Sequence, residues 1–164
     1  MTEMAGIGSG VLTLEQALRW REELRRAGKT LAVTNGCFDL LHRGHAVYLE
    51  QARAEADALL VLVNSDASVR ALKGPSRPLQ SQEDRAFLLC ALKPVDRAVI
   101  FDSPRCDREL ELLAPDVYVK GGDYTAESLD PGERKALEKS GSRLVFIAFV
   151  PGHSSTNIIR RMKP

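Results

Sequence analysis

The sequence predicts an α/β fold, a Rossmann-like doubly wound parallel sheet in three α/β/α layers. Three observations predict it. Short apolar runs alternate with segments of helical spacing, the connections between them are short, and the run ALLVLV at 58–63 is continuously apolar, as strands buried on both faces are. Right-handed crossovers would then cover both faces with helices. The 164 residues are most simply one domain, 13–164, after a flexible N-terminus at 1–12.

Each expected element has its own local signal. The first helix is expected over 14–27, with Thr13 as its N-cap and Gly28 as its stop. The helix over 81–92 opens with Ser-Gln-Glu-Asp, which resembles a capping box. Further helices are predicted over 45–55, 107–113, 130–139 and 155–162, and strands over 31–34, 58–63, 98–101, 117–119 and 144–150. Ligands of such sheets bind beyond the carboxyl ends of the strands, so the loops after strands should carry the site.

Composition argues against several classes of partner. The 23 basic and 22 acidic residues give a net charge of +1, with no reason to expect nucleic-acid binding or a basic membrane patch. Cys37, Cys90 and Cys106 form no CxxC pair, which argues against a disulfide framework or zinc site and fits a reducing compartment. No apolar run approaches the ~20 residues of a membrane span, and the first ten residues do not resemble a signal peptide. We expect a cytoplasmic protein.

The stretch NGCFDLLHRGH, residues 35–45, leads from an expected strand into a helix. Its Asn-Gly pair permits a sharp turn that leaves backbone amides free to face a ligand. His42 and His45 are three positions apart, so both imidazoles are expected on one face of the helix start, where they could stabilise a developing negative charge. Gly44 removes a side chain where a ligand could lie close. The alternatives are a structural pair and a metal site, for which only His153 and scattered carboxylates could complete the ligands.

A second group of residues, GHSSTNIIR at 152–160, follows the most apolar strand and opens a helix. Ser154, Ser155 and Thr156 place three successive hydroxyls at the N-cap and first turn, where free amides also bind anions. One serine would suffice for capping alone, so phosphate binding is favoured. The chain has neither the GxGxxG fingerprint nor a Walker A loop, which argues against a nicotinamide dehydrogenase.

Two more loops after strands carry polar residues. In KGGDY, residues 120–124, paired glycines allow a close backbone approach and Asp123 could accept from a base or sugar hydroxyl, although Gly-Gly-Asp is also an ordinary turn. Asn64 and Asp66 follow ALLVLV and lead to a Gly/Pro loop that is either solvated or a phosphate clamp. The cations that could clamp phosphates there are Lys73, Arg77 and Arg85. Together the four loops predict a bound polyphosphate that is attacked without a covalent intermediate.

These motifs resemble the cytidylyltransferase-like nucleotidyltransferase superfamily. TNGCFDLLHRGH, with HxGH at 42–45, resembles its first signature, and SSTNIIRRM resembles its second. Together with VNSDASVRALKG, SRP, QEDR and VKGGDY, the ordered set covers 14–162 and is most similar to the D-glycero-β-D-manno-heptose 1-phosphate adenylyltransferases. The related glycerol-3-phosphate cytidylyltransferases carry an arginine near the point where Phe149 stands here, which counts against cytidylyl transfer.

The resemblance implies that ATP and heptose 1-phosphate give ADP-heptose, used for lipopolysaccharide core, and pyrophosphate by direct in-line displacement. It implies four catalytic residues: His42 and His45 on the α-phosphoryl and bridging oxygens, Thr156 on the β- and γ-phosphates, and Lys73 offsetting charge. The implied nucleotide-binding residues are Asn35, Gly36, Cys37, Phe38, Gly44, Lys120, Gly121, Gly122, Asp123, Ser154 and Ser155. The implied substrate-binding residues are Asp39, Asn64, Asp66, Arg77 and Arg85. Asp39 is also a candidate for a metal contact, for orienting a neighbouring group or for a helix cap.

The resemblance also implies partners. Mg²⁺ is expected to arrive with ATP, held by phosphates and water without dedicated protein ligands. Relatives often carry a sugar kinase in front of this domain; none precedes it here, so a separate kinase is expected, and a homodimer is left open. Two alternatives remain: a cytidylyltransferase for glycerol 3-phosphate or another small phosphate or phosphonate, and a nucleotide-binding module without catalysis.

Overall fold

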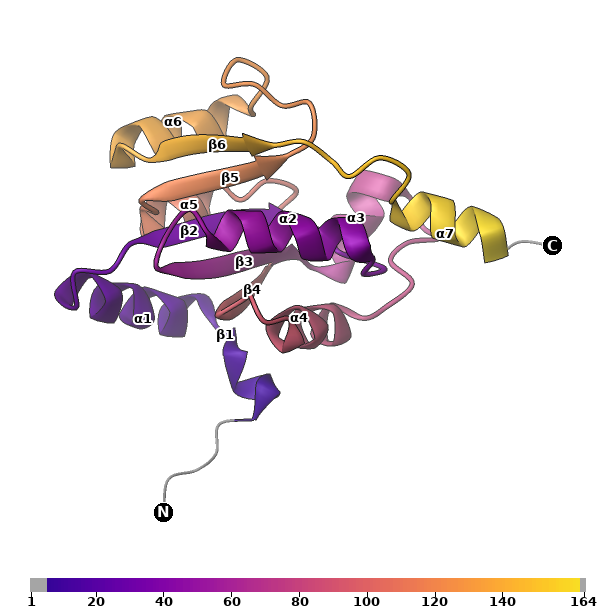
Figure 1. Cartoon of the computed structure of the whole chain (residues 1–164), viewed down its shortest axis with the longest axis horizontal. Helices are drawn as coiled ribbons and strands as arrows, with labels where there is room; N and C mark the ends of the chain where they lie inside the picture. Colours follow the sequence, from indigo (N-terminus) through magenta and orange to yellow (C-terminus); the bar gives the residue numbers. More distant parts are fainter. Residues whose placement is uncertain (1–5, 163–164) are drawn as a thin grey trace.

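A parallel sheet forms the centre of the computed structural model, which describes residues 6–162 (Figure 1). Within that range six strands lie in the order β1-β4-β3-β2-β5-β6, and every neighbouring pair is parallel. Their bounds are β1 Val11–Leu12, β2 Leu31–Gly36, β3 Ala58–Asn64, β4 Arg97–Phe101, β5 Val117–Gly121 and β6 Arg143–Ile147. The chain proceeds from β2 to one side and returns to the other side at β5. The strand order therefore reverses between β2 and β5, which confirms the doubly wound sheet.

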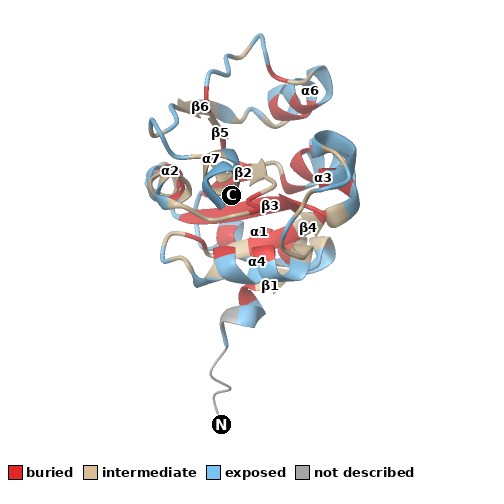
Figure 2. Ribbon diagram, turned by 90° about the vertical axis from the view of Figure 1, so that its right-hand side faces the viewer, coloured by how far each residue is buried: buried red, intermediate tan, exposed pale blue. Residues whose placement is uncertain are grey.

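Helices cover both faces of this sheet, as predicted. Their bounds are α1 Leu14–Arg26, α2 Arg43–Arg53, α3 Asp66–Lys73, α4 Gln82–Ala91, α5 Asp107–Leu113, α6 Pro131–Ser140 and α7 Ser155–Met162. One core unites α1, α5 and α6 with residues such as Leu60 and Tyr118, and a second unites α2 and α4 with Val61 and Val63. Every residue of β3 is buried, because helices pack on both of its sides; Figure 2 shows this buried interior in red. That explains the uninterrupted ALLVLV run.

Local capping signals placed several helix starts correctly. Thr13 caps α1 in a capping box with Gln16, and Ser81 caps α4 by accepting a hydrogen bond from the Asp84 backbone N–H. Gly28, with φ of +67°, follows the end of α1. Side chains within one turn of a helix end determine such caps, so sequence alone reveals them.

Three segments differ from the prediction. Residues 7–12, expected to be flexible, form a 3-10 turn and the edge strand β1, in which Val11 pairs with Ala98; the rest of that expected segment, 1–5, lies outside the described residues. Two residues are too few to show a strand period. The segment expected to be a loop after β3 contains α3, which Ser65 caps. Strand β6 ends at Ile147, three residues before its predicted end.

The fold brings loops that are distant in the sequence together at the carboxyl ends of the parallel strands. The carboxyl ends of β2 and β5 are neighbours, since Val33 lies opposite Tyr118 in the pairing of these strands. Helix α7 lies at the same edge, in front of the sheet in Figure 2. Across residues 6–162, no helix combines the length and the apolar character that crossing a membrane requires.

Candidate active site

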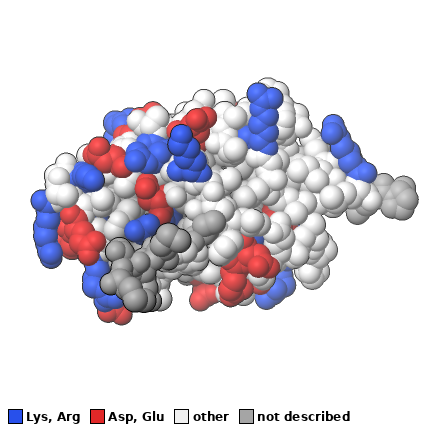
Figure 3. Space-filling view, turned by 60° about the horizontal axis from the view of Figure 1, so that its bottom comes forward, with Lys and Arg blue, Asp and Glu red and all other residues white. Residues whose placement is uncertain are grey.

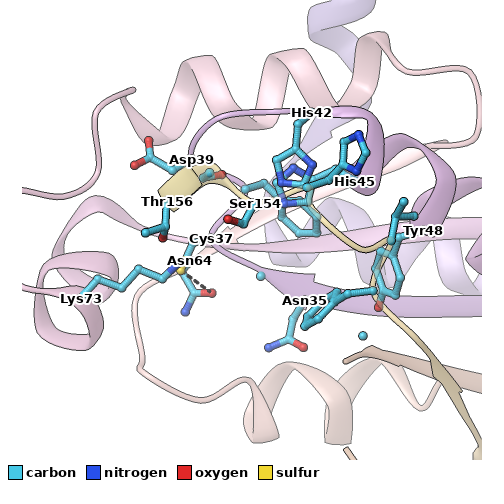
Figure 4. Close-up of a pocket in the computed structure, with 18 of the residues that line it drawn as sticks. Asn35, Cys37, Asp39, His42, His45, Tyr48, Asn64, Lys73, Ser154 and Thr156 are labelled. Atoms are coloured by element: carbon cyan, nitrogen blue, oxygen red, sulfur yellow. Dashed lines mark hydrogen bonds between the residues drawn. The ribbon is translucent and has the colours of Figure 1, made fainter. Parts of the chain in front are cut away.

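A cleft of about 710 Å³ opens at the carboxyl ends of β2 and β5 (Figure 4). It is lined by the loops after β2, β5 and β6 and by the near ends of α2, α3 and α7. Among the predicted site residues, the structure brings together Asn35, Gly36, Cys37, Phe38, Asp39, His42, Gly44, His45, Asn64, Lys73, Lys120, Gly121, Ser154, Ser155 and Thr156. Five predicted residues lie outside its lining: Asp66, Arg77, Arg85, Gly122 and Asp123.

The two histidines of the HxGH motif stack on each other. His42 is the N-cap of α2, with extended φ and ψ of −145° and 173°, whereas His45 is in the first turn. Their ring centroids are 3.8 Å apart and their planes are inclined by 22°. The Phe38 ring lies 5.2 Å from that of His45. The prediction that both imidazoles lie together at the helix start is confirmed.

Burial keeps both imidazoles neutral. It lowers the pKa of His45 to about 4, assisted by the charges of His42 and Lys73. Burial also lowers the pKa of His42, and the neighbouring His153 lowers it further. Desolvation disfavours the charged form of an imidazole, and two rings in contact repel each other when both are protonated. At pH 7 each ring therefore carries one N–H that can donate to a ligand.

Gly44 makes room for the imidazole of His42. A Cβ atom at position 44 would lie 2.9 Å from two ring atoms of His42 and 3.1 Å from the Cβ of His153. Such contacts would push the ring out of its stack. The missing side chain was expected to leave space for a ligand; Gly44 does line the cleft, and its missing side chain also makes room for the His42 ring.

The three hydroxyls before and within α7 have different partners. Ser154 accepts a hydrogen bond from the backbone N–H of Asn157, so its own proton is still available to donate. Ser155 donates its proton to the carbonyl oxygen of Leu40, 2.8 Å away. Thr156 is exposed on the cleft. Phosphate oxygens only accept, so Ser154 and Thr156 suit them. The prediction for the Ser155 side chain is corrected, because its hydroxyl ties α7 to the loop after β2.

Asp39 and Arg77 hold a neighbouring loop. Asp39 is 2% exposed, and its carboxylate accepts from Arg77 Nε at 2.7 Å and from the backbone N–H groups of Leu79 and Gln80. Burial by itself raises the pKa of this carboxyl, but the hydrogen bonds from Leu79, Arg77 and Gln80 outweigh it and lower the pKa. Both side chains are thus engaged in holding the 77–80 loop. This is the orienting role left open for Asp39, whereas the substrate contacts expected of Asp39 and Arg77 and the helix-cap alternative for Asp39 are corrected.

Arg85 is part of the interior. It is 1% exposed and donates to Asp66 Oδ1 at 2.8 Å and to the carbonyl oxygens of Cys37 and Gln80. A guanidinium with these partners cannot reach a phosphate in the cleft. The substrate contacts predicted for Arg85 and Asp66 are therefore corrected. Arg85, held by Asp66, supports the loop after β2 through its hydrogen bond to the carbonyl oxygen of Cys37.

Asn35 is oriented by residues of β5. Its side-chain oxygen accepts from the hydroxyl of Tyr118 at 2.8 Å and from Lys120 Nζ at 3.3 Å. Both partners occupy the oxygen, so the amide nitrogen is left to donate to a ligand. Lys120 Nζ also lies 3.7 Å from a carboxylate oxygen of Glu133, which is 1% exposed. This buried carboxylate holds the ammonium at the base of the cleft.

Gly121 is the last residue of β5 and Gly122 follows it, but the two glycines differ in their relation to the cleft. Gly121 lines the cleft, whereas Gly122 and Asp123 do not, contrary to prediction. Gly122 has φ of +93° and donates its N–H to the carbonyl oxygen of Ile147, so it forms the turn that ends β5. Asp123 follows this turn and is exposed outside the cleft lining.

Several lining residues were not among the predicted site residues, although His153 had been considered as a metal ligand. They are Tyr48, Leu72, Pro104, Arg105, Tyr124, Phe149, Val150, Pro151, Gly152, His153 and Asn157. Tyr48 was detectable, since it lies three residues after His45 on the same helix face. Its hydroxyl lies 2.6 Å from Thr34 Oγ1 and donates to the carbonyl oxygen of Val119, and burial raises its pKa to about 12. Phe149 was noted only as standing where related cytidylyltransferases carry an arginine; a place in the cleft was not predicted for it, because it reads as part of an apolar strand.

The cleft favours an anion. Its lining contains the cations Lys73, Arg105 and Lys120, while its one acidic member among residues 6–162, Asp39, is paired with Arg77. Arg105 and Lys120 lie near the carboxylates of Asp130 and Glu133, so Lys73 contributes most of the uncompensated charge. Lys73 extends from the end of α3 into the same space as Asn64 and Thr156 (Figure 4). On the face drawn in Figure 3, by contrast, acidic and basic side chains are interspersed. A polyanionic ligand would thus be attracted locally.

The family model described as cytidylyltransferase-like matches residues 33–161, which include the stacked histidines and the hydroxyls of α7. The chain belongs to this family. As a cytidylyltransferase-like protein it is an enzyme of the nucleotidyltransferase class. Among residues 6–162 no three histidine, cysteine or carboxylate side chains are grouped to hold a metal ion.

Individual relatives agree with this family assignment. The bifunctional protein HldE of Syntrophotalea carbinolica is 47% identical over 158 residues, which are 92% of this chain and 32% of that protein. The HldE protein of Geotalea uraniireducens is 52% identical over 136 residues, covering 83% of this chain and 27% of its own length. The cytidylyltransferase-like chain thus spans about a third of these curated relatives.

A solved structure supports the same fold. The lipopolysaccharide core biosynthesis protein of Thermoplasma volcanium superposes with a TM-score of 0.60 at 26% identity. The match covers 75% of this chain and 98% of that one. The parallel sheet is therefore shared with a protein whose described role is lipopolysaccharide core synthesis.

Proposed function

We propose that this nucleotidyltransferase transfers AMP from ATP to a sugar 1-phosphate, D-glycero-β-D-manno-heptose 1-phosphate, giving ADP-heptose and pyrophosphate. The observation that carries the proposal is the meeting of His42 and His45 with Ser154 and Thr156 in one cation-lined cleft. The identity with HldE proteins and the likeness to a lipopolysaccharide core biosynthesis protein support the choice of heptose.

The reaction would proceed by direct displacement. An oxygen of the acceptor phosphate forms a bond to the α-phosphorus of ATP, while the bond from that phosphorus to the bridging oxygen breaks and pyrophosphate leaves with the electron pair. The neutral imidazoles of His42 and His45 would donate N–H bonds to the α-phosphoryl and bridging oxygens as charge builds there. The enzyme would contribute positioning and charge stabilisation, with no covalent intermediate.

The β- and γ-phosphates would bind at the start of α7. The hydroxyls of Ser154 and Thr156 and the free backbone N–H groups of this helix end supply donors, and Lys73 supplies positive charge. Mg²⁺ would neutralise part of the triphosphate charge. Because the carboxylate of Asp39 is already engaged by the 77–80 loop, phosphate oxygens and water would hold the ion.

The test is release of pyrophosphate over a panel of nucleotides and acceptors. We expect the fastest release from ATP with heptose 1-phosphate, and release reduced to background in a variant lacking both histidines. Faster release from CTP with glycerol 3-phosphate would establish the cytidylyltransferase alternative instead. No release with any acceptor, despite nucleotide binding, would indicate a binding module.

A further inference from the structure

Phe149 is an exposed aromatic residue inside the cleft. It lies two residues beyond the end of β6, and 69% of it is exposed, although it lines the same cavity as the histidines. A phenyl ring left in water forgoes the stabilisation that burial of its apolar area would supply. The histidines, hydroxyls and lysine of the cleft have roles in the proposed reaction, whereas this ring has none.

The ring rests on a pair of glycines. A Cβ atom at Gly122 would lie 2.5 Å from the Phe149 ring, and one at Gly121 would lie 3.0 Å from it. Any side chain at these positions would therefore displace the ring. One side of the phenyl group thus covers the backbone of residues 121–122, while the exposed remainder belongs to the cleft.

This support is held by both strands. Gly121 pairs with Ile147 in the β5–β6 ladder, and the N–H of Gly122 donates to the Ile147 carbonyl oxygen at 2.9 Å. The backbone under the ring therefore consists of the last residue of β5 and a turn that is hydrogen-bonded to β6, and it is not a free loop. A ring placed on such a support is pre-organised, so a ligand that stacks on it need not order it first.

The surroundings of Phe149 differ from those of the histidines. Tyr124, 41% exposed, also lines the cleft, and Lys120 Nζ lies 4.9 Å from the centroid of its ring. The ring of Tyr48 lies beside Gly121. The exposed aromatic rings of the cleft, Phe149 and Tyr124, thus lie near the ends of β5 and β6, whereas hydroxyls and imidazoles lie at α7 and α2. A nucleotide divides in the same way, into an apolar base and a charged phosphate chain.

We propose that Phe149 is the platform on which the nucleobase stacks, and that it makes the site prefer ATP over CTP. A purine covers more of a phenyl ring than a pyrimidine does, and stacking on aromatic side chains stabilises bound bases. The inference rests on the proposed function for the class of ligand, but it concerns binding and not the acceptor.

The experiment measures dissociation constants by calorimetry for ATP, CTP and inorganic tripolyphosphate, which lacks a base. In Phe149→Ala we expect ATP to bind about 5- to 100-fold more weakly, CTP to be affected less, and tripolyphosphate to bind as before. Phe149→Trp should keep the affinity for ATP. Leu112→Ala, which removes an exposed apolar side chain on α5 outside the cleft, is the matched control and should change nothing.

The outcomes separate this inference from the proposed reaction. Unchanged ATP binding in Phe149→Ala, or an equal loss for ATP and tripolyphosphate, overturns the platform. Equal losses for ATP and CTP overturn its role in selectivity. A selective loss of ATP binding supports the inference even when no acceptor tried with the wild-type enzyme releases pyrophosphate, a result that would remove only the proposed reaction.

Discussion

The imidazole of His42 stacks on that of His45, with 3.8 Å between ring centroids. This contact joins the N-cap of α2 to its first turn. Burial lowers both pKa values; the charges of His42 and Lys73 lower that of His45 further, and the charge of His153 lowers that of His42. Both rings are therefore neutral at pH 7 and can each donate one N–H, and the positive charge in the cleft lining comes from lysine and arginine.

Replacing His45 by alanine removes one of these donors. We expect turnover to fall by about 10²–10³-fold, the effect of losing one hydrogen-bond donor to a transition state. Steady-state pyrophosphate release measures it, with ATP binding and urea unfolding followed in parallel to show that the fold persists. Near-normal turnover would remove this histidine from the mechanism.

The lowered pKa of His45 predicts how stability depends on pH. The pKa of a histidine in the unfolded chain is about 6.5, whereas the pKa of His45 in the folded protein is about 4. Between these values the unfolded chain binds a proton that the folded chain does not, so acid favours unfolding. The free energy of unfolding should fall as the pH drops from about 6.5 to about 4, and should fall less in His45→Gln. Identical slopes for the two proteins in urea titrations would contradict the shifted pKa.

Gly44→Ala should separate activity from stability. The new methyl group would meet the His42 ring at 2.9 Å and displace it. Alanine nevertheless favours a helix over glycine by up to about 1 kcal/mol. We expect turnover to fall at least about tenfold, the effect of misplacing a catalytic group, with a melting temperature that is unchanged or slightly higher. A variant with full activity would show that the stacked position of His42 is not required.

Arg85→Met should destabilise the protein. The substitution leaves Asp66 and the carbonyl oxygens of Cys37 and Gln80 without their donor. We expect the free energy of unfolding to fall by about 2–4 kcal/mol. The control is Arg134→Ala, which loses only an exposed pair with Glu138 and should change stability by less than about 0.5 kcal/mol. Equal effects of the two substitutions would mean that the buried network contributes little.

Thr156→Ala and Ser155→Ala should behave differently despite their adjacent positions. Loss of the exposed Thr156 hydroxyl should raise the Michaelis constant for ATP by about fivefold, the effect of one hydrogen bond. Loss of the Ser155 hydroxyl breaks its bond to Leu40 and should instead lower the melting temperature. An unchanged Michaelis constant in Thr156→Ala would reject its contact with phosphate.

Local patterns in the sequence were sufficient for most of the architecture. The apolar run of β3, the caps at Thr13 and Ser81 and the position of HxGH at the end of a strand each depend on residues within one turn or one strand. Apolar period and capping are short-range effects, so the parallel sheet, its layers and the location of the cleft could be predicted. The two-residue strand β1 was too short to be visible in this way.

The sequence by itself indicated the loops after β2, β3, β5 and β6, each of which contributes to the cleft lining, but it missed the loop after β4 with Pro104 and Arg105. Only the tertiary structure decided which of their side chains face the cleft. Arg85 and Asp39 have the same charges that a phosphate or metal site would use, yet partners far along the chain engage both in the interior. Phe149, which resembles a core residue, is exposed at the cleft because β6 ends before it. The physical reason is that a polar side chain bonds to whatever donors and acceptors folding brings within about 3 Å, and no local pattern encodes that distance.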